Sequence, residues 1–279
     1  MTRFDAADVR RYYDRHNASF VRYGQGRGSI HRAVWGPGTR TRDEAFHYVD
    51  DQVATLARRF MSSTRDVHVV DLGCGVGASL CYLAEQVPIR GTGITLSPAQ
   101  AAMAREVVAA LGLSERVECL EGDYCDVPAR IPHADLAYAI ESFVHGPDPE
   151  RFFDQCRRLL KPGGLLAICD DVKKGAASPD AARTIDEFMT GWHINTLLEH
   201  DTLVRMARDA GFEHESTADL TPMLEINRVR DRAIAGGIAL LKRLPLNTGR
   251  FDYVIGGGAL QTCLTKGWIG YELSVFRSA

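Results

Sequence analysis

The chain has 279 residues, 45% hydrophobic and 25% charged, which are the proportions of an ordinary globular protein with a sizeable core. Its formal net charge is −3 with both signs interspersed, so it lacks the basic stripe that a nucleic-acid partner requires. Seven cysteines form no CxxC pair, and neither a signal peptide nor a bilayer-length apolar run is found, so we expect a cytoplasmic protein with reduced thiols and no membrane partner.

The N-terminal part of the chain is expected to be helical. Apolar and aromatic side chains recur at helical spacing within residues 5–20: Val9, Tyr12, Tyr13, His16 and Phe20. The glycine-rich residues 21–38 predict a loop, and a TxxE capping box of Thr41 and Glu44 predicts the start of a second helix.

Short apolar runs then alternate with helical segments, which is typical of βαβ units and a parallel sheet. The expected strands are 67–71, 89–94, 117–120, 134–140 and 165–169. The expected helices are about 77–86, 97–111 and 149–160, the last two opened by Ser97-Pro98 and Asp148-Pro149.

Beyond residue 170 the pattern is weaker. Residues 178–192 and 199–212 predict helices, and 271–277 predict a strand. Residues 222–267 fit no simple helix or strand repeat.

A glycine-rich loop follows the first expected strand in VHVVDLGCGVGASL. Glycines at this place let a ligand approach the backbone and the following helix N-terminus. The same letters fit a dinucleotide loop, G-x-G-x-x-A, if Ala78 is the last position. A dinucleotide site usually has an acid about 20 residues further on. The segment GTGITLSPAQ has none, which disfavours a nicotinamide cofactor.

Four segments within residues 67–170 carry a family resemblance: VVDLGCGVG, GITLSPAQ, GDYCDVP and DLAYAIESFVHGPDPERFFDQCRRLLKPGG. Together they resemble the core of class I S-adenosylmethionine-dependent methyltransferases. TLS followed by Gln100, and the acidic segment YAIESFVHGPDP, are similar to the branch that contains sterol and geranyl diphosphate or prenyl C-methyltransferases and cyclopropane fatty acid synthases.

The resemblance implies an α/β fold with a doubly wound, seven-stranded Rossmann-like sheet. It implies an N-terminal helical lid at 1–66 and an S-adenosylmethionine-binding domain at 67–279, with lid insertions at about 171–200 and 218–267. The cofactor is then S-adenosyl-L-methionine.

Cofactor contacts are carried over by the same resemblance, to Tyr13, Asp71, Gly73, Gly75, Gly77, Thr95, Leu96, Gln100, Asp123, Tyr124 and Ile140. Three of these have structural alternatives. Gln100 either binds the ribose or completes a capping box with Ser97. Asp123 is either a ligand or a turn residue, and Asp71 either contacts the cofactor or organises the loop.

If the acceptor is an alkene, methyl transfer leaves a carbocation, which aromatic faces and a carboxylate stabilise. We expect Glu141, His145 and Tyr23 to be catalytic. The expected substrate-binding residues are Tyr12, His31, Trp35, Phe143, Trp192 and His193. The alternatives are a structural acceptor role for Glu141, a surface turn for His145, and core packing for the tyrosines.

The function expected first is C-methylation of the alkene of a prenyl or terpenoid small molecule in secondary metabolism, through a cation that cyclises or loses a proton. O- or N-methylation, with His145 or His193 as base, and a non-catalytic cofactor-binding module are the alternatives. No histidines have metal-ligand spacing, so no metal is expected. Arg22, Arg27 and Arg32 either meet an anionic group or are solvated. The partner is a small, prenylated acceptor, and the sequence is compatible with a homo-oligomer.

Overall fold

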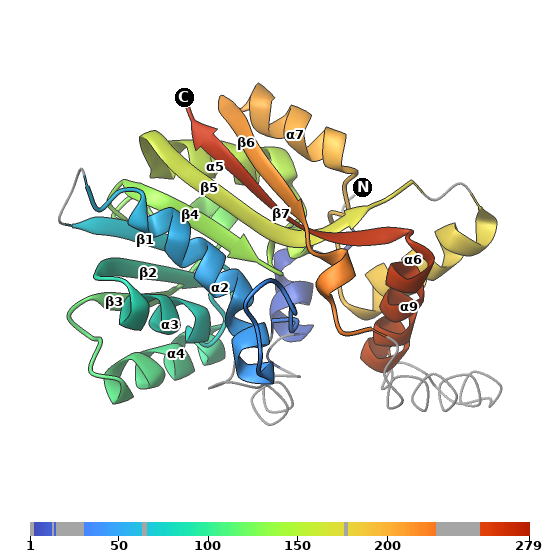
Figure 1. The fold of residues 1–279 in the computed structure, drawn as a ribbon, viewed down its shortest axis with the longest axis horizontal. Helices are drawn as coiled ribbons and strands as arrows, with labels where there is room; N and C mark the ends of the chain where they lie inside the picture. The colour runs from blue at the N-terminus through green and yellow to red at the C-terminus, as the bar shows by residue number, and fades with distance from the viewer. Residues whose placement is uncertain (1–2, 13, 15–30, 63–65, 176–177, 227–251) are drawn as a thin grey trace.

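A computed structural model describes residues 3–12, 14, 31–62, 66–175, 178–226 and 252–279, which form a seven-stranded sheet flanked by helices (Figure 1). The strands are β1 Val67–Leu72, β2 Ile89–Thr95, β3 Val117–Glu121, β4 Ala134–Ile140, β5 Leu160–Lys173, β6 Phe212–Asp219 and β7 Ile269–Ser278. Their order is β3-β2-β1-β4-β5-β7-β6, with β7 antiparallel to both of its neighbours. The expected doubly wound α/β fold is confirmed.

The strand order predicts where a ligand-binding crevice lies. The chain leaves β1 toward β2 on one side, and β4 pairs with β1 on the other. In open α/β sheets ligands bind at the carboxyl ends of the strands where the order reverses in this way. The site is therefore expected at the ends of β1 and β4.

Helices cover both faces of the sheet. They are α2 Arg42–Arg58, α3 Ala78–Gln86, α4 Pro98–Ala110, α5 Pro149–Leu159, α6 Pro179–Gly191, α7 His200–Asp209 and α9 Asp252–Lys266, with short 3₁₀ turns η1 Tyr124–Asp126, η2 Phe143–His145 and η3 Thr221–Met223. Successive β1 side chains point to opposite faces, so Val69 packs with α2 and α3 while Val70 packs with α5. Both faces are covered at the centre of the sheet, so every residue of β1 and β4 is buried.

The helix starts follow the expected caps. Thr41 and Glu44 form a complete capping box, and the Asp148 side chain accepts a hydrogen bond from the Arg151 backbone N–H. Residues 6–12 are helical, as expected for this part of 5–20, while 15–20 lie outside the described residues. No helix in the described ranges is both long and apolar enough to cross a bilayer.

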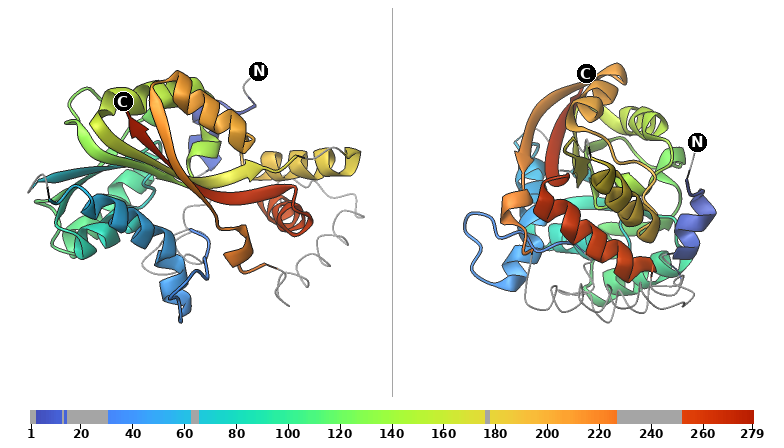
Figure 2. Two further views of the ribbon diagram at one scale, coloured as in Figure 1. Left: turned by 45° about the horizontal axis from the view of Figure 1, so that its top comes forward. Right: turned by 90° about the vertical axis from the view of Figure 1, so that its right-hand side faces the viewer.

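Two elements were not expected from the sequence. The strand β6 has only Phe212 buried among its eight residues, because it is an edge strand paired with β7 alone. The helix α9 lies within the segment that fits no repeat, and it packs against α6 beside the sheet (Figure 2). The expected insertion from about 171 begins as the last three residues of β5.

Candidate active site

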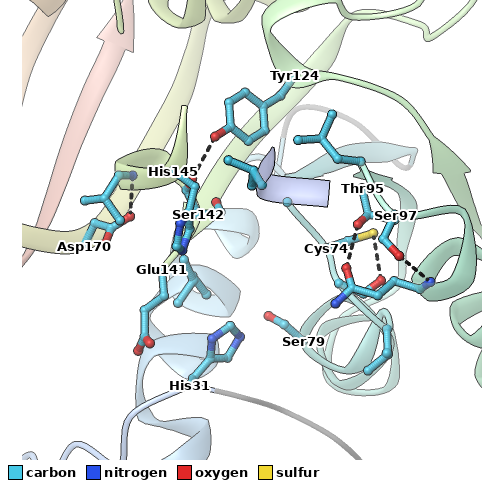
Figure 3. A pocket seen from close by; sticks show the side chains of 18 of the residues that line it. His31, Cys74, Ser79, Thr95, Ser97, Tyr124, Glu141, Ser142, His145 and Asp170 are labelled. Atoms are coloured by element: carbon cyan, nitrogen blue, oxygen red, sulfur yellow. Dashed lines mark hydrogen bonds between the residues drawn. The ribbon is translucent and has the colours of Figure 1, made fainter. Parts of the chain in front are cut away.

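A pocket of about 220 Å³ opens at the carboxyl ends of β1, β2 and β4. One wall is formed by the glycine-rich loop and the turn after β2, and the opposite wall by residues after β4 and β5 (Figure 3). Thr95, Ser97 and Cys74 belong to the first wall, and Glu141 and His145 to the second. The location agrees with the crevice that the strand order predicts.

The three glycines of the loop have different structural roles. Gly73 and Gly75 have left-handed φ of +104° and +53°. A Cβ on Gly73 would lie 2.4 Å from the Cβ of Ser142, whereas a Cβ on Gly75 would meet no atom of the described residues within 4 Å. Gly75 therefore presents bare backbone to the pocket, which fits a ligand that approaches the main chain closely. Gly77 does not line the pocket, and its Cβ would meet Ala104 at 3.2 Å, so its role is helix packing.

The turn after β2 supplies polar groups to the same wall. The Thr95 hydroxyl donates to Oε1 of Gln100 at 2.9 Å, and the Gln100 backbone N–H donates to the Ser97 hydroxyl oxygen at 3.1 Å. Only the Ser97 half of a capping box is present, because the Gln100 side chain bonds Thr95 instead. Thr95, Leu96 and Gln100 all line the pocket.

Asp71 lies behind this wall in a buried hydrogen-bond network. The Tyr138 hydroxyl donates to Asp71 Oδ2 at 2.9 Å and lies 3.3 Å from the Ser79 hydroxyl. Ser79 donates to Asp50 Oδ1 at 2.5 Å, and Asp50 Oδ2 lies 2.8 Å from His47 Nδ1. The network joins α2 and α3 to β1 and β4. Asp71 does not line the pocket, and its side chain accepts the hydrogen bond of Tyr138, so it connects β1 to β4 behind this wall.

Burial raises the pKa of Asp71 to about 8, and the Tyr138 hydrogen bond opposes this shift only in part. The folded protein thus holds this proton up to higher pH than the unfolded chain does, and the contribution of Asp71 to stability falls as pH rises from about 4 to about 8.

Asp71→Asn is expected to abolish this loss. In urea unfolding, its stability advantage over wild type should grow by about 1.4 kcal/mol per pH unit in that window. The same change at exposed Asp209 is the control; equal behaviour of both variants would contradict the prediction.

Glu141 is held at the end of β4 in the left-handed region, with φ of +50°. Its Oε1 accepts hydrogen bonds from the Arg32 backbone N–H at 2.8 Å and from the Tyr271 hydroxyl at 2.9 Å. The Arg32 guanidinium is bidentate to Asp171 at 2.6 and 2.7 Å and lies 4.7 Å from the centre of the Tyr271 ring. Arg32 is therefore neither solvated nor directed to an external anion, because protein carboxylates engage it.

His145 is buried in η2 rather than exposed in a surface turn. Its Nδ1 lies 3.1 Å from the His193 carbonyl oxygen. A carbonyl can only accept, so Nδ1 carries the proton and Nε2 carries the lone pair. Burial lowers the pKa of His145 to about 4, so the ring is neutral at physiological pH.

The other expected residues are divided by the pocket boundary. Tyr12, His31, Tyr124, Ile140 and Trp192 line the pocket. Outside the lining, Trp35 is 38% exposed, Phe143 packs against Phe152, and the His193 ring stacks on Tyr12 and Phe4. Asp123 is also outside, where it accepts a hydrogen bond from the Cys125 N–H and so begins η1. Tyr13 and Tyr23 lie outside the described residues.

Among the described residues, six polar residues of the lining were not expected in the site from the sequence: Arg10, Ser79, Ser97, Ser142, Asp170 and Asp171. The two aspartates follow the apolar core of β5, next to β4. The carboxyl-end rule applied to this neighbouring strand could have found them. Ser79 and Ser142 had no such signal, because their positions depend on the folding of the glycine loop against β4.

The fold and the pocket define a doubly wound α/β protein with a pocket at the carboxyl ends of its strands, where this fold class binds ligands. Residues 70–168 match the family described as methyltransferase domain. The O-methyltransferase cnsE of Penicillium expansum is 31% identical over 195 residues, which cover 69% of this chain and 68% of that protein. Methyltransferase GfsG of Streptomyces halstedii is 29% identical over 246 residues, covering 86% and 82%.

A solved structure gives the same architecture. Geranyl diphosphate C-methyltransferase from Streptomyces coelicolor A3(2), in complex with Mg²⁺, geranyl diphosphate and S-adenosyl-L-homocysteine, has a TM-score of 0.69 at 19% identity and covers 98% of each chain. The chain belongs to the S-adenosylmethionine-dependent methyltransferases, as the sequence resemblance implied. It is an enzyme whose cofactor is S-adenosylmethionine.

Proposed function

We propose that this methyltransferase acts on a hydroxyl group of a small natural product, with His145 as the general base. Bound S-adenosylmethionine supplies an electrophilic methyl group. The observation that carries the proposal is a buried, neutral imidazole in the pocket lining, with its Nδ1 proton held by the His193 carbonyl. The relative cnsE is an O-methyltransferase, which supports the same chemistry.

The cofactor and the acceptor are assigned to opposite walls of the pocket. We assign the cofactor to the wall with Gly75, Thr95 and Gln100, where bare backbone and polar groups meet. The acceptor then lies toward Glu141 and His145 on the opposite wall (Figure 3). The assignment of 1–66 as a lid, and of Tyr13 and Tyr23 to the site, stays a prediction.

A hydroxyl that receives a methyl group must lose its proton, and a base within reach takes it. His145 can accept a proton because its pKa of about 4 keeps it neutral at pH 7, but the same low pKa makes it a weaker base than an ordinary histidine. The His193 carbonyl fixes the ring by accepting the Nδ1 proton. His193 itself is the weaker candidate for a base, since its ring stacks on Tyr12 outside the lining.

His145→Asn is expected to lower kcat about 10²–10³-fold, because asparagine can still donate to the His193 carbonyl but cannot accept the proton. Calorimetry should give wild-type affinity for S-adenosylhomocysteine. The measurement is turnover on a panel of phenols, alcohols and amines with isotope-labelled methyl donor. His133→Asn, at an exposed position, is the control. Undiminished turnover of His145→Asn would remove this residue from the mechanism.

Alkene C-methylation is the second candidate, and the fixed carboxylate of Glu141 favours it, because an anion held at the pocket stabilises a carbocation. NMR analysis of the labelled product separates the two. A new carbon–oxygen or carbon–nitrogen bond supports the first candidate class, and a new carbon–carbon bond supports the second. In the second case Glu141→Gln should reduce turnover more than His145→Asn does.

A further inference from the structure

The helix α6 ends at Gly191 and is followed by Trp192, whose side chain both lines the pocket and rests on α9. A Cβ added to the buried Gly256 of α9 would lie 2.7 Å from Trp192 Cδ1 and 2.9 Å from Gly191 Cα. A Cβ on Gly257 would lie 3.8 Å from the indole, which is an ordinary contact. Glycine inside a helix costs about 1 kcal/mol relative to alanine, so Gly256 needs a packing reason. The close approach of Trp192 is that reason.

The chain beyond Trp192 is fixed as well. His193 has a left-handed φ of +53°, which places it at a sharp corner after α6. Its ring stacks on Phe4 and Tyr12 with centroid distances of 4.2 and 4.5 Å. Its carbonyl accepts the hydrogen bond from His145. The Trp192–His193 corner therefore connects α9 to the proposed base through packed side chains and one hydrogen bond.

The indole has little room to move away from the pocket, because α9 lies against it. Any group added at Gly256 must push the indole or α6 away from α9. Removal of the indole leaves space between the pocket and the bare face of α9. The position of one side chain thus decides how far the pocket extends on the His145 side.

We infer that Trp192, seated on Gly256, sets the size limit for the apolar part of the acceptor. This rests on the proposed function, which assigns the His145 side of the pocket to the acceptor. Gly256 is a positioning residue that acts through Trp192, and Trp192 is the specificity-determining residue.

The test uses the full-length protein saturated with S-adenosylhomocysteine and a series of phenols from 4-methylphenol to 4-octylphenol, with binding measured by calorimetry. Gly256→Ala is expected to weaken binding of the longest phenol on the order of tenfold, because the added methyl group pushes the indole toward the pocket. It should leave 4-methylphenol and S-adenosylhomocysteine within about twofold of wild type. Gly257→Ala makes the same change one residue away and should behave as wild type.

Trp192→Ala should have the opposite effect to Gly256→Ala: it should improve the affinity of the longer phenols relative to 4-methylphenol. The inference is overturned if Gly256→Ala and Gly257→Ala have the same chain-length dependence, if Trp192→Ala leaves that dependence unchanged, or if no phenol binds the wild-type protein. Binding requires no turnover, so a failure of the His145 prediction remains distinguishable from a failure of this one.

Discussion

Gly75→Val is expected to abolish binding of S-adenosylhomocysteine in calorimetry while the protein remains folded. In the part of the chain that the structure describes, no atom lies within 4 Å of the Cβ position at Gly75, so the valine side chain would enter the pocket rather than clash with the core. The left-handed φ of +53° costs a non-glycine residue about 1–2 kcal/mol, which a domain of this size tolerates. Loss of binding would thus come from the occupied space and not from unfolding.

Gly112→Val is the matched control. Gly112 has a left-handed φ of +68°, is exposed, and also has no atom within 4 Å of its Cβ position. The variant carries the same backbone strain away from the pocket. We expect a similar decrease in melting temperature and wild-type affinity for S-adenosylhomocysteine. Retained affinity in Gly75→Val would show that the cofactor does not approach this loop.

The strands β1 to β4 were predictable because they are short, mostly apolar runs; β1 and β4 are buried on both faces, whereas β3 buries alternate residues. The caps at Ser97 and Asp148, each followed by proline, mark the helices that follow β2 and β4. The predicted ends of the strands β1 to β4 differ from the observed ends by one residue at most. The glycine loop was predictable for the same local reason, since φ above zero and close ligand approach both require glycine.

The remaining elements depend on partners far away in sequence. The sequence FEHESTAD is polar and becomes β6 only because β7 supplies its hydrogen bonds. The three consecutive glycines of α9 disfavour a helix locally, while the packing of Trp192 on Gly256 requires one of them. Within the site, Arg32 pairs with Asp171, which lies 139 positions further along the chain, and no local sequence pattern predicts this pair.

Arg32→Met is expected to destabilise the protein by about 3–5 kcal/mol, because it leaves buried carboxylates without their cation. The Asp171 side chain is 2% exposed, and Arg32 is its bidentate partner. Burial raises the pKa of Asp171 and the guanidinium opposes that rise, so the carboxylate depends on Arg32 for its charge. Thermal unfolding should show a decrease on the order of 10 °C.

The controls separate loss of this pair from loss of any arginine. Arg183→Met breaks an exposed pair with Asp180 and should change stability by less than about 1 kcal/mol. Arg32→Met combined with Asp171→Leu should recover much of the loss, since no unpaired charge remains at Asp171.

The pH dependence gives the sharpest test. Without the guanidinium the pKa of Asp171 rises further above its unfolded value, so the folded variant takes up a proton as pH falls. A protonated Asp171 needs no cation, and the stability deficit of Arg32→Met relative to wild type should therefore shrink toward low pH. A deficit that is independent of pH would mean that Arg32 stabilises the protein by packing on Tyr271 rather than by its charge.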